Sequence, residues 1–150
     1  MAAPMRRGAG IVAAHMNPGA AAAEARLAAF VEERLADYAA RRDLPAEDAT
    51  SGLSEHLAWG EIGPRQIWQA GLRAREEGVA GAEAFLREVA WREFAYHLIY
   101  HFPDLARRNW RAEWDGFPWA TDPDAPRVMA WKQGLTGVPF VDAAMREMHV

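Results

Sequence analysis

Apolar and polar residues alternate with the period of an α-helix along most of this chain. From about Gly19 to Tyr38, apolar side chains recur at steps of three and four residues, and acidic side chains occupy the opposite face. This pattern predicts one long amphipathic helix. A polar loop at residues 47–52 leads to a short helix near Ser54, and Pro64 marks the start of a third helix that runs to Gly78.

The strongest helical pattern covers residues 81–101 and ends before Pro103, because proline cannot continue a helix. An aromatic, irregular connection follows at residues 104–122, then a helix near Pro126 and a last helix near Pro139. No segment of convincing length alternates with the period of a β-strand. The expected fold is therefore all-α and multi-helical.

The first sixteen residues lack this periodicity. Two arginines precede a short apolar run at residues 11–14, which is shorter than the hydrophobic region of a secretion signal. Residues 1–16 are predicted to be a disordered leader, and residues 17–150 a single helical unit. We expect a cytoplasmic location.

Composition narrows the choice of function. The 150 residues are 51% hydrophobic, without an apolar run long enough to span a membrane, so we expect a globular chain with no membrane partner. The absence of cysteine excludes disulfides, thiolate metal sites and a cysteine nucleophile. A net charge of −4 argues against coating nucleic acid through bulk charge, although a local basic groove remains compatible with it.

One stripe of the strongest helix combines an acid, an indole and a cation, since Glu88, Trp91 and Arg92 lie at three- and four-residue steps with Phe85. Such a stripe can grip a flat heterocycle. The alternative, favoured by spacing alone, is an ordinary amphipathic helix with a Glu88–Arg92 ion pair and a core tryptophan.

Other polar groups allow two interpretations. Thr50, Ser51 and Ser54 present hydroxyl and N–H groups that suit a phosphate, or that only cap a helix. His97 and His101 lack a third ligand, so no metal site is predicted, and His56 has no evident partner. Three further tryptophans in the irregular connection are read as packing residues, or less readily as an electron relay: Trp110, Trp114 and Trp119.

Four motifs in order carry a family resemblance. They are Thr-Ser-Gly-Leu-Ser at 50–54, Trp-Gly-Glu-Ile-Gly-Pro-Arg-Gln at 59–66, Glu-Val-Ala-Trp-Arg-Glu-Phe at 88–94, and the run from Ala130 to Arg146 that contains Thr-Gly-Val-Pro. Over residues 17–150 the chain resembles the FAD-binding domain of the DNA photolyase and cryptochrome family, and most closely the class I cyclobutane-dimer photolyases of bacteria. Only the N-terminal part of that domain is matched, without the α/β antenna domain.

The resemblance implies a lyase that uses FAD and blue light to send an electron into a flipped pyrimidine dimer in ultraviolet-damaged DNA. By this resemblance Glu88 hydrogen-bonds the dimer, Trp91 packs against it, and Arg92 lies in the cofactor and substrate region. Trp119 matches the surface end of the tryptophan chain that photoreduces FAD. The remaining residues are matched to positions that contact the cofactor: Tyr38, Thr50, Ser51, Leu53, Ser54 and Phe85.

Three positions depart from the family pattern. Gly52 stands where arginine is usual, Phe85 where tryptophan is frequent, and Phe140 where an aliphatic residue is usual. Because only the N-terminal part of the domain is matched, the resemblance implies an incomplete FAD-binding domain with little activity alone and with an apolar face that supports self-association. Two alternatives remain open: a remnant that binds DNA or a partner without flavin, and a fragment of a photosensory cryptochrome.

Overall fold

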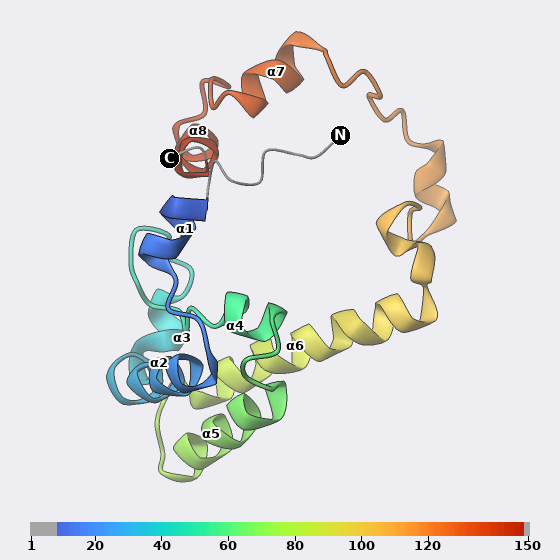
Figure 1. Cartoon of the computed structure of the whole chain (residues 1–150). Coiled ribbons are helices and arrows are strands. Elements are labelled where there is room, and N and C mark those ends of the chain that lie inside the picture. The colour runs from blue at the N-terminus through green and yellow to red at the C-terminus, as the bar shows by residue number, and fades with distance from the viewer. Residues whose placement is uncertain (1–8, 149–150) are drawn as a thin grey trace. The chain divides into compact units, whose positions relative to one another are not determined.

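The computed structural model describes residues 9–148, apart from the side chain of Ile11 (Figure 1). These residues form helices and connecting loops without any β-strand, which confirms the all-α prediction. The chain divides into two compact units, Met1–Ala106 and Arg107–Val150, and each is described by itself.

The first unit contains six α-helices and two 3₁₀ turns among the described residues. Their bounds are α1 Ala9–His15, α2 Ala20–Glu33, η1 Leu35–Asp37, α3 Tyr38–Arg41, α4 Ser54–Ala58, α5 Pro64–Glu76, α6 Ala82–His101 and η2 Pro103–Ala106. The starts of α4, α5 and α6 and the end of α6 lie where the sequence signals place them. Gly63 and Pro64 form the expected start of α5, and the Gln66 side chain accepts the Gly63 N–H at 2.8 Å.

The N-terminal segment differs from the disordered leader expected at residues 1–16. Residues 1–8 lie outside the described part of the chain, but Ala9–His15 form helix α1, which continues to a hydrogen bond from Met16 N–H to the Val12 carbonyl. Alanine has the highest helix propensity, and three of these seven residues are alanine.

The long helix expected between Gly19 and Tyr38 is interrupted. Arg34 leaves the helical region with φ −126°, and the chain continues as η1 and then α3. The Arg34 guanidinium pairs with Asp48 at 2.8 Å, and Leu35 becomes fully buried. The prediction of one continuous helix was wrong, because burial of Leu35 and Tyr38 in the same core requires a bend that the periodicity does not show.

The core of the first unit is an aromatic cluster beneath α2, α3 and the start of α6. The ring of Phe30 lies 4.8 Å from that of Phe85 and 5.6 Å from that of Tyr38, centroid to centroid. Gly81 packs directly on η1, since a Cβ there would lie 1.8 Å from the Leu35 carbonyl oxygen. This contact brings the first turns of α6 into the core.

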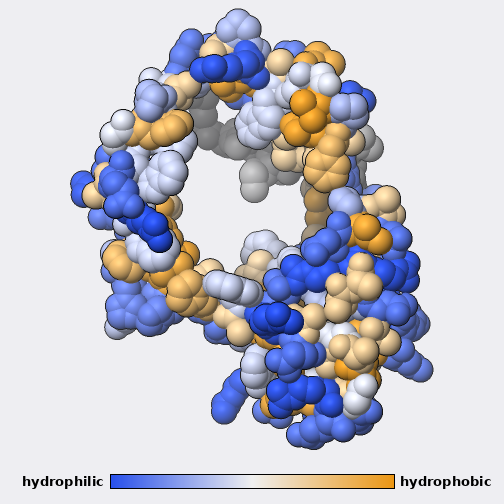
Figure 2. Space-filling model, turned by 180° about the vertical axis from the view of Figure 1, so that it is seen from behind, coloured by the Kyte–Doolittle hydropathy of each residue, from blue (hydrophilic) through white to orange (hydrophobic). Residues whose placement is uncertain are grey.

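Burial stops part of the way along α6. All buried apolar side chains of the described residues lie between Ala23 and Leu86, whereas Trp91, Phe94 and Tyr100 further along α6 are exposed. Figure 2 shows hydrophobic residues at the surface among polar ones. Within the part of the chain that the structure describes, no helix combines the length and the apolar character that crossing a bilayer requires.

The second unit contains η3 (Ala112–Gly116), α7 (Pro126–Lys132) and α8 (Pro139–Glu147). Both helices begin at the expected prolines, and Gly134 follows α7 at φ +65°. The buried Asp142 carboxylate accepts the Thr136 N–H at 2.7 Å, the Thr136 hydroxyl at 2.6 Å and the Gly137 N–H at 3.0 Å. These bonds fix the turn between the two helices.

Candidate functional site

A small cavity of the first unit, about 130 Å³, gathers most of the residues that the sequence singled out. Side chains from α3, from the loop before α4, from α4 itself, from α5 and from α6 line it. Six of the lining residues belong to the predicted cofactor and substrate set: Tyr38, Ser51, Leu53, Phe85, Glu88 and Arg92. The structure thus brings together positions up to 54 residues apart in the sequence.

One wall of the cavity is the aromatic cluster. Tyr38 and Phe85 are buried, and their rings meet edge to face at 5.6 Å. Burial raises the pKa of the Tyr38 hydroxyl further above neutral pH, where a tyrosine hydroxyl is already protonated and can donate a hydrogen bond. The wall therefore offers flat apolar surface together with one hydroxyl.

A second wall is the Thr50–Ser54 loop. Ser51 and Leu53 face the cavity, whereas Thr50 and Ser54 are exposed on the same loop and do not line it. Gly52, between them, has φ +59°, in the left-handed region that glycine adopts without strain. No backbone N–H of residues 50–54 is bonded to another group of the described chain, so these donors remain available.

The loop is fastened to its surroundings through α4. The buried His56 donates from Nδ1 to the Glu61 carboxylate at 2.6 Å, and the other Glu61 oxygen accepts the Gly19 N–H at 2.8 Å. The hydrogen bond from His56 is the main cause that lowers the pKa of Glu61. His56 thus has a partner that the sequence analysis missed, five residues further along the chain.

The ion pair of Glu88 differs from the Glu88–Arg92 pair that helical spacing predicted. Glu88 pairs with the Arg42 guanidinium of the segment after α3, and not with Arg92. That hydrogen bond is the main cause that raises the pKa of Arg42, whose guanidinium carbon also lies 5.5 Å from the Tyr38 ring centre. Arg92 instead contacts Glu93 and Tyr96. The Glu88–Arg92 pair of the ordinary-helix interpretation is therefore not formed.

Trp91 does not line this cavity. The residue is 61% exposed, and its ring meets that of Phe94 edge to face, at 5.7 Å between centroids. The core tryptophan of the ordinary-helix interpretation is thus not observed. Trp91 lies one turn along α6 from Glu88, on a part of the helix that carries exposed aromatic side chains.

Trp119 belongs to the second unit. It packs against Phe117 at 4.6 Å between ring centres and donates from Nε1 to the Trp114 carbonyl at 2.8 Å, while 54% of the residue stays exposed. The predicted role of Trp119 in electron transfer stays a prediction. Its geometry is that of a tryptophan held near the surface by a local cluster.

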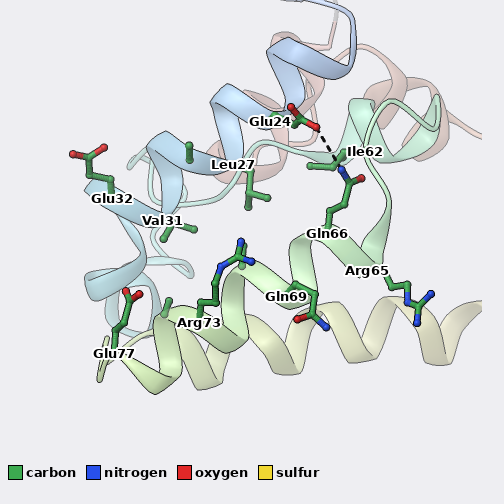
Figure 3. A pocket seen from close by; sticks show the side chains of 13 residues that line it. Glu24, Leu27, Val31, Glu32, Ile62, Arg65, Gln66, Gln69, Arg73 and Glu77 are labelled. Atoms are coloured by element: carbon green, nitrogen blue, oxygen red, sulfur yellow. Dashed lines mark hydrogen bonds between the residues drawn. The ribbon is translucent and has the colours of Figure 1, made fainter.

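A larger groove, about 790 Å³, lies between α2 and α5 and contains none of the predicted residues (Figure 3). Leu27, Val31 and Ile62 form an apolar floor, and Glu24 on α2 receives a long hydrogen bond of 3.5 Å from Gln66 on α5. Charged side chains of both signs stand at its edges. The groove offers volume, but it has no convergent set of buried polar groups.

Sequence reasoning missed several residues at or beside the cavity. Arg42, which pairs with Glu88 without lining the cavity, was detectable as a neighbour of Tyr38, because it stands four residues further along the chain and such pairs are neighbours on a helix. The apolar lining residues Leu57, Ile67 and Val89 carry no signal that separates them from ordinary core positions. Among residues 9–148 the structure contains no cluster of three metal-ligating side chains.

Comparisons with known proteins point in one direction. The profile of the FAD-binding domain of DNA photolyase matches residues 85–150. The deoxyribodipyrimidine photo-lyase of Agrobacterium fabrum is 44% identical over 134 residues, which are 88% of this chain and 27% of that protein. The Escherichia coli protein of the same name is 37% identical over 139 residues, 91% of this chain and 29% of the relative.

A plant relative and a solved structure agree with these matches. Cryptochrome-2 of Arabidopsis thaliana is 36% identical over 140 residues, 88% of this chain and 22% of that protein. The crystal structure of a bacterial class III photolyase from Agrobacterium tumefaciens superposes with a TM-score of 0.79 at 42% identity, covering 87% of this chain and 27% of that one. The chain thus spans roughly a quarter of the length of these proteins.

Proposed function

Because the chain belongs to the DNA photolyase and cryptochrome family through its FAD-binding domain, we propose that it contributes to flavin-dependent, light-driven repair of pyrimidine dimers in DNA. One observation carries the proposal. Six residues that the resemblance matches to the cofactor and the lesion line a single cavity, although they come from three separate segments of the chain.

The donor set of the cavity suits FAD. The free N–H groups of the Thr50–Ser54 loop and the Ser51 hydroxyl suit the phosphates, and the Tyr38 hydroxyl with the faces of Leu53 and Phe85 suits a flat ring system. The volume of this partly open cavity, about 130 Å³, is well below the ~300–1,000 Å³ of typical small-molecule sites. These residues therefore fit one side of the cofactor.

The Glu88 carboxylate of the cavity, together with its partner Arg42, suits recognition of a pyrimidine dimer. When bound, FAD would absorb the light and supply the electron. Glu88 presents a carboxylate that accepts hydrogen bonds from the imide N–H groups of the bases, and Arg42 holds that carboxylate in place. The exposed ring of Trp91 offers a stacking surface for a base that has left the duplex.

A chimera tests the proposal, because it places this chain within a protein of the full length of its relatives, whose repair activity can be measured. Residues 17–148 of this chain replace the aligned segment of the Agrobacterium fabrum photo-lyase, and repair of an oligonucleotide with a cyclobutane thymine dimer is followed under blue light. We expect light-dependent repair and bound flavin. A folded chimera that binds flavin and DNA but repairs nothing contradicts the repair function.

Variants of the chimera separate the roles. Glu88→Gln keeps the size of the side chain and is expected to lower repair by about tenfold, since a hydrogen bond to a charged group is lost. The flavin absorbance should stay unchanged. Arg65→Gln, at the edge of the groove between α2 and α5, serves as the matched control, with repair expected at the parent level.

The photosensory alternative rests on the similarity to cryptochrome-2. A signalling protein also binds FAD, but it has no use for a carboxylate that recognises a dimer. Flavin binding and photoreduction in the chimera, without tighter binding of dimer-containing than of undamaged DNA, favours that alternative.

Exposed aromatic side chains support two further proposals. We propose that the chain binds ultraviolet-damaged DNA and that its apolar surface also supports association between copies, because soluble monomers rarely expose large apolar patches. Sedimentation of the purified chain across a concentration series tests the second point, and a monomer at every concentration contradicts it. As a separate point, we propose that the chain is located in the cytoplasm.

A further inference from the structure

The Thr50–Ser54 loop needs support from elsewhere in the fold. Outside helix α4, the hydrogen bond that its backbone makes runs from Leu57 N–H to the Leu53 carbonyl at 2.9 Å. Gly52 at its centre adopts φ +59°, and glycine has more conformational freedom than any other residue. The loop alone would therefore sample several conformations.

Arg26 of α2 supplies this support. Its Nη1 donates to the Gly52 carbonyl at 2.7 Å and also to the Glu55 carboxylate in the first turn of α4. One guanidinium thereby joins the middle of the loop to the helix that follows it. Charge-assisted hydrogen bonds of this kind are stronger than those between neutral groups, and the Arg26 side chain is only 27% exposed.

The space beside Gly52 is occupied by Arg26. A Cβ added at Gly52 would meet Cδ and Nη1 of Arg26, each at 3.7 Å. That distance is an ordinary van der Waals contact, so the Arg26 side chain packs directly beside the Gly52 backbone. Any other residue at position 52 would be strained by the positive φ.

Arg26 contacts the loop without lining the cavity. The neighbours Ser51 and Leu53 line the cavity, whereas Arg26 does not. Arg26 therefore affects a bound group only through the conformation of the loop. The cationic side chain that lines the cavity is Arg92 of α6.

We propose that Arg26 is the positioning residue of the Thr50–Ser54 loop, holding the Gly52 peptide so that the loop presents its N–H and hydroxyl groups to the diphosphate of a dinucleotide. This inference rests on the proposed function for the identity of the ligand. The fastening of the loop by Arg26 does not depend on that identity.

The test combines loop order with diphosphate binding in the full chain. Arg26→Met removes the donors and keeps the length, Arg26→Lys restores a cationic donor, and Glu55→Gln breaks the ion pair but leaves the bond to Gly52. Backbone ¹⁵N order parameters of residues 51–53 are measured without ligand. ADP binding is then compared with binding of adenosine, which lacks the phosphates.

In Arg26→Met we expect order parameters of residues 51–53 below about 0.6, where a rigid backbone gives about 0.85. We also expect ADP affinity to fall about tenfold, as for loss of one charge-assisted hydrogen bond, with adenosine unaffected. Arg26→Lys should recover most of both values, and Glu55→Gln should stay near the parent.

Two results decide the outcome. A rigid loop and unchanged ADP affinity in a folded Arg26→Met variant overturn the inference. If the parent chain fails to bind ADP, the phosphate part of the proposed function fails. The order parameters then decide the role of Arg26 by themselves. Unchanged signals of Phe30 and Phe85 show that the variants are folded.

Discussion

Aromatic side chains have opposite surroundings in two regions of this molecule. In residues 20–86, Phe30, Tyr38 and Phe85 meet one another at 4.8–5.6 Å and are buried. In residues 107–148, Trp114, Phe117 and Trp119 also contact one another, but each is about half exposed. Contacts between rings are thus not enough to form a core. A core also needs surrounding elements that exclude water from the rings.

The second region is held by polar contacts of short range. Asp142 binds the turn at Thr136 and Gly137, the Arg146 guanidinium donates to the Gly134 carbonyl at 3.2 Å, and the Trp119 indole donates to Trp114. The first region depends on burial of apolar area, which contributes more free energy per residue than an exposed hydrogen bond does. The two regions should therefore respond differently to substitution.

The largest effect is expected for Phe30→Ala. Phe30 is fully buried between Tyr38 and Phe85, so its removal leaves a cavity and should lower the free energy of unfolding of residues 20–106 by about 3–5 kcal/mol. Denaturant unfolding followed by NMR reports each region separately. Equal destabilisation of residues 107–148 would contradict the division between the two regions.

A smaller loss is expected for Gly81→Ala. The new Cβ would lie 1.8 Å from the Leu35 carbonyl oxygen, so η1 and α6 must separate, at a cost of about 1–3 kcal/mol. Gly116→Ala is the matched control in the second region, because a Cβ there meets nothing within 4 Å. Thermal unfolding compares the two, and equal stabilities would refute the close contact of α6 with η1.

A local effect is expected for Asp142→Asn. Hydrogen bonds from Thr136 chiefly lower the pKa of the Asp142 carboxyl, so the charged form stabilises the turn above the ordinary pKa of about 4. This stabilisation is lost as pH falls through the lower pKa of the folded state. NMR shifts of the Thr136 and Gly137 amides between pH 2 and 6, chosen as about two units either side of that value, should titrate in the parent and stay flat in the variant.

The smallest effect is expected for Trp119→Phe. The variant loses the hydrogen bond to the Trp114 carbonyl, which water can replace at this exposed position, so the cost should be at or below about 1 kcal/mol. Trp114→Phe is the matched control, since it keeps the backbone acceptor. Amide shifts of residues 112–119 report the change, and a loss as large as that of Phe30→Ala would place a core in this region.

The beginnings and ends of helices were predictable because their causes are local. Pro64, Pro126 and Pro139 each stand at a first helical position, and α6 ends at His101, just before Pro103. A proline lacks the N–H that a helix interior needs, whatever surrounds it. The break at Arg34 escaped prediction, since it depends on the burial of Leu35 against Gly81 from a distant segment.

The features of the candidate site also divide into those that local sequence determined and those that depend on distant segments. The sequence by itself determined which residue types stand at positions 38, 50–54 and 85–92, and hence the family resemblance and the all-α class. Only the tertiary structure decided that Glu88 pairs with Arg42, that Arg26 donates to Gly52, and that Trp91 stays exposed. Helical periodicity specifies neighbours within about one turn, whereas the partner of a charged side chain depends on which distant element packs beside it.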